Sequence, residues 1–592
     1  MRGRTSATLS RLLQPLACLL VLGVTHVALA ANAQPNFVLI LVDDAGFMDF
    51  GGYGGEANTP NIDEIADEGV RFTNYHTSPL CAPSRAMLLT GLDNHKTGVA
   101  TIPEVLTEEQ AKSPGYAMHL LPGVRTIADY LSNAGYETFM TGKWHLGRGE
   151  GDLPDSHGFD RSFALDASGA DNWEQKSFMP FYDEAPWFED GAPADLPADF
   201  YSSKFLVDKM LEYLRGRRQS KPFFAYIAFQ AIHIPVQAPR EFTDRYQGVY
   251  ADGWQATLER RFARARELGL VPDDAVMPSM HASLRQWESL SAEEQALYER
   301  SMMVNAGMLE AMDHHIGRLV EYLRSSGEME NTVFVITSDN GPEFADPVAS
   351  AGFRLWMRQN GYDSDIDRLG EKGSMVAIGP EWASAAAVPG SLFKVYASEG
   401  GTRVPLIVRG PGIAPRRFAS SLNFVIDVAP TIADLAGVER ADDMQGRSLV
   451  PILTGEAQEI YGDDDVVGLE VAGNAALFKG RHKVTRNTLP HGDATWRLHD
   501  LSRDPAEVDD LSEQSPALRE ELLADYEAYA QAMDVVALPA DFDVYAQIAV
   551  NVAKKRLADN WPTLVIVGVA ILGAALFGGF LLVRRLHRSR QA

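Results

Sequence analysis

The sequence predicts an α/β fold in which a large, mostly parallel sheet is covered by helices. Residues 37–42 are all apolar, and 332–337 hold four apolar residues between two threonines, as in strands that a parallel sheet buries on both faces. Residues 306–324 carry apolar side chains at helical spacing ahead of the second strand, and Gly327 is expected to end that helix. Helices that alternate with buried strands are typical of an α/β domain.

The composition is that of a folded globular protein. Of the 592 residues, 46% are hydrophobic and 9% are aromatic, so the chain can bury a large core. The formal net charge of −27 argues against a nucleic acid as a partner, because phosphate binding requires a basic face. This charge does not exclude a small anionic substrate, since a local group of cations can attract an anion against an acidic background.

The first thirty residues predict an export signal. Basic residues precede an apolar run at 12–27, and small residues at 28–30 form a cleavage site. An uncleaved membrane anchor is the alternative. We therefore expect residues 1–30 to be removed and the rest of the chain to be exported.

A second apolar segment lies near the other end of the chain. Residues 564–583 carry no charge and are long enough to span a bilayer. Trp561 and the arginines of 584–592 flank this segment, so 561–583 is expected to be a transmembrane helix and 584–592 a cytoplasmic basic tail. A buried core helix and a tail trimmed after sorting are the alternatives. The expected protein lies on the periplasmic or extracellular face, anchored to the membrane by this one helix.

Cys81 is expected to be the sole cysteine of the mature protein, because the other one, Cys18, lies within the export signal. Pro83 suits the first turn of a helix and Gly91 its end, so Cys81 lies near a helix N-terminus. The backbone N–H groups there favour negative charge, and Arg85 adds a cation one turn further on. A buried spectator thiol is the alternative.

Oxygen-bearing side chains follow both of the predicted strands. Asp43 and Asp44 follow the first strand, and Asp339 and Asn340 follow the second. Ligands bind at the carboxyl ends of strands in an α/β sheet, and adjacent carboxylates there repel each other unless a cation compensates them. Oxygen ligands suit Ca²⁺ or Mg²⁺ better than Zn²⁺. The sequence therefore predicts a metal site, with solvated turn residues as the alternative for either pair alone.

Basic and imidazole side chains follow two further predicted strands. Lys143 and His145 come just after a short strand, and His233 follows the apolar run 223–229. Lys394 lies in a later loop. A lone histidine after a strand is more often structural, but four strand ends with complementary charges favour a functional site.

Several segments resemble the signatures of the type I, formylglycine-dependent sulfatases, which belong to the alkaline phosphatase superfamily. The matching segments are C-A-P-S-R at 81–85 with T-G at 90–91, G-K-W-H-L-G at 142–147, H-I-P at 233–235, and E-G-G-T-R-V-P at 399–405 with Lys394 upstream. The position of this lysine resembles the bacterial arylsulfatase-like branch of the family. The resemblance covers most of residues 35–535.

The resemblance implies an alkaline-phosphatase-like sulfatase fold. Such a fold has a large mixed, mostly parallel sheet flanked by helices, and a small C-terminal α+β subdomain with an antiparallel sheet. We expect the catalytic domain at 35–455, the C-terminal subdomain at 456–535 and a linker at 536–560. Residues 345–392 form a long insertion that either lines a pocket for an aryl or other apolar leaving group or simply packs onto the core.

The resemblance also implies the chemistry. In this family a maturation enzyme, the formylglycine-generating enzyme or an equivalent, oxidises the cysteine to an aldehyde whose hydrate is the nucleophile. The implied ligands of one Ca²⁺ are Asp43, Asp44, Asp339, Asn340 and the modified Cys81. The implied catalytic residues are Cys81, Arg85, Lys143, His145, His233 and Lys394. His233 and Lys394 would help to protonate the leaving oxygen, and His145 would take the proton of the second hydroxyl.

The expected reaction is hydrolysis of a sulfate monoester to an alcohol or phenol and sulfate. Aryl sulfates are the first candidates, and sulfated sugars and steroid sulfates also fit. A phosphonate or phosphate monoester hydrolase with the same site is one rival function. A non-catalytic, membrane-tethered binding protein is the other.

Overall fold

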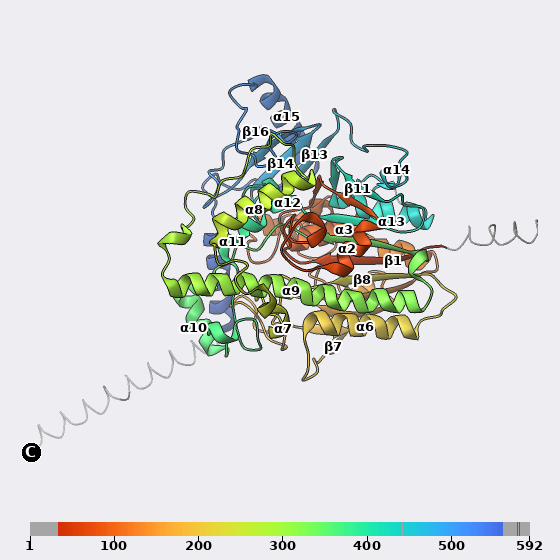
Figure 1. Ribbon diagram of the computed structural model, residues 1–592, viewed down its shortest axis with the longest axis horizontal. Helices are drawn as coiled ribbons and strands as arrows, with labels where there is room; N and C mark the ends of the chain where they lie inside the picture. Colours follow the sequence, from red (N-terminus) through yellow and green to blue (C-terminus); the bar gives the residue numbers. More distant parts are fainter. Residues whose placement is uncertain (1–33, 441, 561–576, 578, 580–592) are drawn as a thin grey trace, which may run out of the picture.

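A computed structural model describes residues 34–440, 442–560, 577 and 579 of the chain. A ten-stranded sheet runs through the larger part of the molecule, in the order β11-β2-β10-β9-β1-β8-β4-β5-β6-β7 (Figure 1). Its strands are β1 (Asn36–Val42), β2 (Val70–Phe72), β4 (Glu137–Lys143), β5 (Arg161–Leu165), β6 (Trp187–Glu189), β7 (Ala192–Ala194), β8 (Phe223–Ala228), β9 (Thr332–Ser338), β10 (Leu406–Arg409) and β11 (Arg416–Ala419). A separate pair joins β3 (Tyr75–His76) to β12 (Asn423–Phe424).

The centre of the sheet is parallel. β1 pairs in parallel with β8 on one side and β9 on the other, and β8 pairs in parallel with β4. β10 is antiparallel to both of its sheet neighbours, β9 and β2, and β6 and β7 are antiparallel at the other edge. The prediction of a mixed, mostly parallel sheet is therefore confirmed, and the four central strands end at the same edge.

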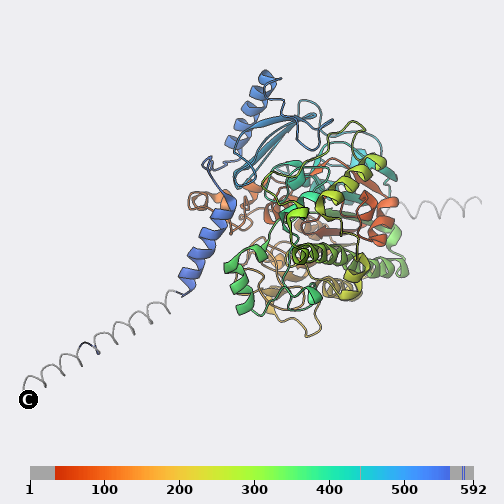
Figure 2. The ribbon, with the colours of Figure 1, turned by 60° about the vertical axis from the view of Figure 1, so that its left-hand side comes forward.

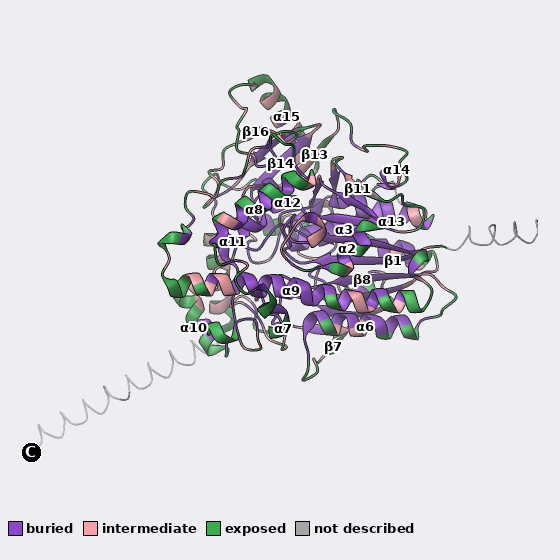
Figure 3. Cartoon of the chain, viewed as in Figure 1, coloured by how far each residue is buried: buried purple, intermediate pink, exposed green. Residues whose placement is uncertain are grey.

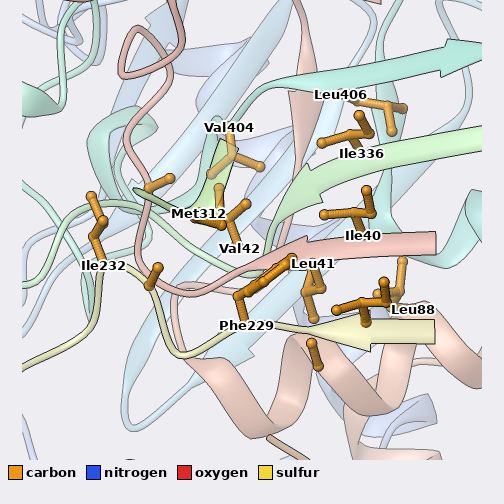
Figure 4. Close-up of a cluster of buried hydrophobic side chains, with 14 of the residues drawn as sticks. Ile40, Leu41, Val42, Leu88, Phe229, Ile232, Met312, Ile336, Val404 and Leu406 are labelled. Carbon is orange, nitrogen blue, oxygen red and sulfur yellow. The ribbon is translucent and has the colours of Figure 1, made fainter. Parts of the chain in front are cut away.

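The central strands are apolar because helices bury both of their faces. Every residue of β1 is buried, and Figure 3 shows the same for the strands beside it. In Figure 4, Ile40 of β1 lies beside Ile336 of β9, its partner in the register, with Leu88 packed nearby. Leu88 belongs to α3 (Cys81–Thr90), so the helix that carries the cysteine packs directly on the sheet.

The helices form two groups, with the sheet drawn between them in Figure 1. In one group, α9 (Ala292–Ser325) contacts α2 (Pro60–Asp67), α6 (Ser202–Gly216) and α7 (Arg240–Thr243). In the other, α13 (Val428–Ala436) contacts α3 and α5 (Ile127–Asn133). The remaining helices include α4 (Asn94–Thr97), α8 (Gly253–Leu268), α10 (Ala351–Gln359), α11 (Gly379–Ala386), α12 (Glu399–Thr402) and α14 (Val450–Leu453).

Helix α9 is longer than the predicted 306–324 because it begins earlier. Ser291 caps its N-terminus, with the Ser291 Oγ accepting a hydrogen bond from the Glu294 N–H and the Glu294 carboxylate accepting one from the Ser291 N–H. This capping box is a start signal that the apolar pattern alone does not reveal.

The C-terminal part is a small antiparallel sheet covered by one helix, as expected. Its strands are β13 (Val466–Val471), β14 (Asn474–Lys479), β15 (His482–Arg486) and β16 (Arg497–Asp500), and the helix is α15 (Pro516–Ala532). Figure 1 shows this unit above the large sheet. Leu477, Val484 and Leu522 belong to a small core of its own.

Residues 536–560 differ from the expected linker, because 544–560 are helical. Asp543 caps this helix by accepting a hydrogen bond from the Ala546 N–H at 2.9 Å. Tyr545 and Ile548 lie on one face and pack against the main core. Figure 2 shows the helix descending from the C-terminal unit along the side of the molecule.

Within the residues that the structure describes, no helix has both the length and the apolar character needed to cross a bilayer. The export signal expected at 1–30 and the cytoplasmic tail expected at 584–592 lie outside the described residues. The transmembrane helix expected at 561–583 also lies outside them, apart from Phe577 and Gly579.

Candidate active site

The oxygen-bearing side chains predicted at two strand ends lie together. Asp43 and Asp44 follow β1, and Asp339 and Asn340 follow β9, its parallel neighbour. The Asn340 Nδ2 donates a hydrogen bond to the Asp44 Oδ1 at 2.6 Å, and the Asp44 N–H donates to the Asp339 Oδ1 at 3.2 Å. All four side chains are buried. The sheet thus gathers three carboxylates and an amide in a space closed to bulk solvent.

Cys81 joins this cluster from α3. The helix begins at Cys81 itself, two residues before the expected Pro83, and ends at Gly91 in the left-handed conformation (φ 69°). The Cys81 side chain is 1% exposed, and its Sγ lies 3.8 Å from the Asp44 Oδ1. Burial raises the pKa of the Cys81 thiol well above its ordinary value, and Lys143 and Lys394 lower it only in part. The unmodified thiol therefore keeps its proton, despite its place at a helix N-terminus.

Arg85 links the carboxylates at the ends of β1 and β9 to strand β4, which lies beyond β8 in the sheet. Its Nη2 lies 2.7 Å from the Asp339 Oδ2 and 3.5 Å from the Asp43 Oδ2, and its Nη1 donates to the Lys143 carbonyl oxygen at 2.9 Å. Burial opposes the charge of Arg85, but the Asp339 and Asp43 carboxylates outweigh it and raise the pKa of the guanidinium. Arg85 is therefore a fixed positive charge within the site.

The cluster has the donor set of a site for a hard divalent cation. Asp43, Asp44, Asp339 and Cys81 offer ligand atoms that all lie within 4.8 Å of one another. Among the described residues, the Asp43 Oδ1 and the Asn340 Oδ1 are buried without a hydrogen-bond partner, which is costly unless a ligand completes them. Burial, with the neighbouring carboxylates, raises the pKa of Asp44 and of Asp339 against the opposing effect of Lys394 and Arg85. A bound cation would remove this penalty, so the residues present fit a metal ion.

Two lysines reach the same carboxylates. The Lys143 Nζ, at the end of β4, donates to the Asp43 Oδ2 at 2.7 Å. The Lys394 Nζ donates to the Asp44 Oδ2 at 2.9 Å and to the Glu343 Oε2 at 2.9 Å. Although Lys394 lies in a loop, it is only 5% exposed. Burial opposes its charge, but Asp44 and the other anions raise the pKa of Lys394 well above its ordinary value.

Both predicted histidines lie in the site as neutral imidazoles. The His233 Nδ1 lies 2.6 Å from the Ile234 carbonyl oxygen, which can only accept, so Nδ1 carries the hydrogen. Its Nε2 lies 3.8 Å from the Asp44 Oδ2 and 3.8 Å from the Glu343 Oε2. Neither ring nitrogen of His145 has a hydrogen-bond partner among the described residues. Burial, and then nearby lysine charge, lowers the pKa of both rings well below the ordinary value.

Glu343 is a residue of the site that the sequence analysis missed. It contacts Lys394, lies near His233, and accepts hydrogen bonds from the N–H groups of Phe344 and Ala345. Burial raises the pKa of Glu343, but the charge of Lys394 outweighs this and lowers it to about 2. The available signal was its position two residues after Gly341, at the same strand end as Asp339 and Asn340.

A cavity of about 1180 Å³ opens from these side chains toward the surface, with Leu80, His233, Glu343 and Lys394 in its lining. Phe353 and Trp356 of the 345–392 insertion also line it. In contrast, Trp382 of the same insertion packs in the core against Trp254, at a ring distance of 5.8 Å. The insertion therefore both lines this cavity and packs onto the core.

Comparisons with known proteins agree with this geometry. The sulfatase family profile matches residues 35–438, and the profile of the N-sulphoglucosamine sulphohydrolase C-terminal region matches residues 391–528. An arylsulfatase of Klebsiella aerogenes is 34% identical over 433 residues, which cover 72% of this chain and 91% of the relative. An uncharacterised sulfatase of Schizosaccharomyces pombe is 34% identical over 535 residues, which cover 87% of this chain and 96% of the relative.

Solved structures share the fold. A sulfatase from Pseudoalteromonas sp. superposes with a TM-score of 0.56 at 21% identity, covering 88% of this chain and 94% of the other. A protein solved in complex with its substrate D-glucosamine-2-N,6-O-disulfate superposes with a TM-score of 0.56 at 23% identity, covering 85% and 98%. The profile match spans most of the chain, and relatives at 34% identity align along most of their own length. The chain therefore belongs to the sulfatase family.

Proposed function

We propose that this sulfuric ester hydrolase acts through a formylglycine derived from Cys81 and one bound Ca²⁺, with aryl sulfates among its substrates. One observation carries the proposal: at the start of α3, the Cys81 Sγ lies 3.8 Å from the Asp44 Oδ1, in a buried cluster with two oxygens that have no hydrogen-bond partner among the described residues. The arylsulfatase of Klebsiella aerogenes supports the choice of aryl esters, being 34% identical over 72% of this chain.

Asp43, Asp44, Asp339 and Asn340 would hold the metal, together with the modified side chain of Cys81. The bound cation would lower the pKa of the attacking hydroxyl and draw charge from the sulfate oxygens. The aldehyde hydrate would supply an oxygen nucleophile, which a buried, protonated thiol cannot do. Arg85 would keep Asp339 and Asp43 in place by its hydrogen bonds and charge.

The remaining side chains would neutralise charge and move protons. Lys143 and Lys394 would stabilise the negative sulfate oxygens, an electrostatic contribution that is usually large in a buried site. Lys394, whose pKa is raised, would carry a proton toward the leaving oxygen, and His233 would orient that transfer from beside it. His145, neutral and without a partner among the described side chains, is free to accept the proton of the second hydroxyl.

The domain limits and the location are part of the proposal. Residues 35–455 would form the catalytic domain and 456–535 the C-terminal subdomain. A cleaved signal at 1–30 would export the chain, a helix at 561–583 would anchor it, and 584–592 would remain in the cytoplasm. Because Cys81 is buried in the folded protein, the maturation enzyme would act before the chain folds.

A mass spectrum of the tryptic peptide Phe72–Arg85 from protein made in its native host tests the proposal. The expected result is an aldehyde at Cys81, seen as replacement of the thiol sulfur by oxygen, and about one Ca²⁺ per chain by elemental analysis. An intact thiol in active enzyme would refute the proposed nucleophile. The Cys81→Ala variant, purified in the same way, is the matched control for both measurements.

A further inference from the structure

The helix at 544–560 forms one wall of the cavity above the active site. The residues that it contributes recur at helical spacing on one face: Tyr545, Ile548, Ala549, Val552, Arg556 and Asn560. In contrast, Val550 and Leu557 point away from the cavity and are 44% and 55% exposed. One face of this helix therefore lines the cavity, and the opposite face is exposed.

Hydrogen bonds fix the helix to the segment before α5. The Asn551 Nδ2 donates to the carbonyl oxygens of Glu104 at 3.0 Å and Leu106 at 2.9 Å, and the Lys554 Nζ lies 2.7 Å from the Glu108 Oε1. At the start of the helix, the Tyr545 ring packs edge-on against Phe344 at 4.8 Å. These hydrogen bonds to the backbone carbonyls hold the helix at 544–560 in a defined position beside the cavity.

The cavity reaches from this wall to the two residues proposed to act on the leaving oxygen. Lys394 and His233 both line it, as do Glu343 and Phe344, which follows Glu343 directly. Phe353 and Trp356 of α10 also line the cavity and contact each other at a ring distance of 5.2 Å. A group attached to the leaving oxygen would therefore extend between two apolar surfaces, α10 and the helix at 544–560.

The volume and the charges of the cavity restrict what can fill it. Its volume of about 1180 Å³ exceeds the roughly 300–1,000 Å³ of ordinary small-molecule sites. Among the described lining residues, Lys394 and Arg556 are the only lysine or arginine side chains, and Arg556 is paired with Asp183 at 3.2 Å. The lining also carries Glu104 and Asp346. An ester with several sulfate groups would find no free cation there and would meet carboxylates.

We propose that the physiological substrate is a sulfate monoester of a bulky apolar alcohol or phenol, larger than one aromatic ring, and that the helix at 544–560 selects for it. The inference rests on the proposed sulfatase function and names the leaving-group class of the same site. Burial of the apolar group against Ile548 and Val552 favours such esters, because each buried methylene contributes about 0.8 kcal/mol.

Two esters with matched reactivity test the proposal: 4-methylphenyl sulfate and 4-octylphenyl sulfate. Their phenols have nearly the same acidity, so the ratio of kcat/KM values reports apolar contact alone. We expect the full-length enzyme to prefer the octyl ester by at least roughly tenfold. The Val552→Trp variant, which adds a bulky side chain to this wall, should lower kcat/KM for the octyl ester and thereby remove most of this preference. Val550→Trp, on the exposed face of the same helix, should leave both values unchanged.

The outcomes separate this inference from the function on which it rests. Hydrolysis of neither ester by formylglycine-bearing enzyme would refute the proposed function itself. Hydrolysis of both at equal rates, or an equal response to Val550→Trp and Val552→Trp, would overturn the inference alone. Activity of Val552→Trp on 4-methylphenyl sulfate shows that the variant is folded.

The octyl ester is offered both dissolved and in phosphatidylcholine vesicles, since the uncharged run at 564–583 begins four residues after Asn560. Faster turnover in vesicles would identify a bilayer as the source of the ester, and faster turnover when dissolved would identify the aqueous pool.

Discussion

Glu343 is one of the carboxylates that favour the charged form of Lys394, the side chain proposed to protonate the leaving oxygen. Its Oε2 lies 2.9 Å from the Lys394 Nζ and 3.8 Å from the His233 Nε2. Burial works against the Lys394 ammonium, and the Glu343 carboxylate is one of the anions that outweigh burial and raise the pKa of Lys394. Glu343 is thus a positioning residue that acts through Lys394.

Replacing this carboxylate by an amide should change the pH dependence of the enzyme. In Glu343→Gln the pKa of Lys394 falls, because an anion that favours the ammonium is lost. If protonated Lys394 is required, the alkaline limb of the kcat/KM profile moves to lower pH, and the maximal value falls roughly tenfold to a hundredfold. The measurement is a pH–rate profile on 4-nitrophenyl sulfate. The control is Glu381→Gln, which removes a buried partner of Arg285 outside the site and should leave the pH–rate profile unchanged. An unchanged profile in Glu343→Gln would exclude the proposed effect of Glu343 on Lys394.

At the scale of elements, the end of β9 fits against the E-G-G segment only because Gly341 has no side chain. A Cβ on Gly341 would collide with the carbonyl oxygen of Gly400 in α12. The Gly341 N–H also donates to the Gly401 carbonyl oxygen at 2.9 Å. The turn that carries Asp339 and Asn340 is therefore seated directly on α12.

Gly341→Ala should lower both stability and activity. Relief of the collision requires the strand end to move, at a cost of about 1–3 kcal/mol in the free energy of unfolding. Displacement of Asn340 should lower kcat/KM at least roughly tenfold, because catalysis depends on the position of the groups around the reacting atoms. Urea unfolding and steady-state kinetics measure the two effects. In Gly216→Ala, at the end of α6, the added Cβ meets no atom within 4 Å, so both quantities should stay near the wild-type values.

The local pattern of apolar residues explains which helices and strands could be predicted from the sequence. Strands β1 and β9 could be predicted because parallel strands buried on both faces appear in the sequence as apolar runs. The residues that follow them marked the edge where the proposed metal site lies. The helix at 544–560 was not recognised, because its apolar face is short and packs against loops distant in the sequence. Glu343 carried no motif of its own, and its role depends on the approach of Lys394, fifty-one residues further on. Contacts of this kind are set by the tertiary fold rather than by local sequence.

At the scale of the whole molecule, a buried histidine joins the C-terminal sheet to the catalytic part. The His95 Nδ1 lies 3.0 Å from the Asp93 Oδ1, and its Nε2 lies 3.0 Å from the Glu470 Oε2 on β13. Burial opposes its charge, but hydrogen bonds to the two carboxylates raise the pKa of His95 to about 9. The imidazolium is therefore an ionic link between the two parts.

This link makes stability depend on pH in a defined direction. The folded pKa of about 9 exceeds the unfolded value of about 6.5, so the stabilisation is complete below pH 6.5 and is lost as pH rises through 9. Across that window the free energy of unfolding should fall by up to about 1.4 kcal/mol per pH unit from this group. Urea unfolding at pH values from 6 to 10 should show the slope in the wild type and a much smaller slope in His95→Gln. His482→Gln, a partly exposed site on β15 of the same sheet, should keep the wild-type slope. If His95→Gln retained the full slope, the pH dependence would arise elsewhere, and the two parts would be held together by their apolar contacts and by the buried pair of Lys483 with Glu399.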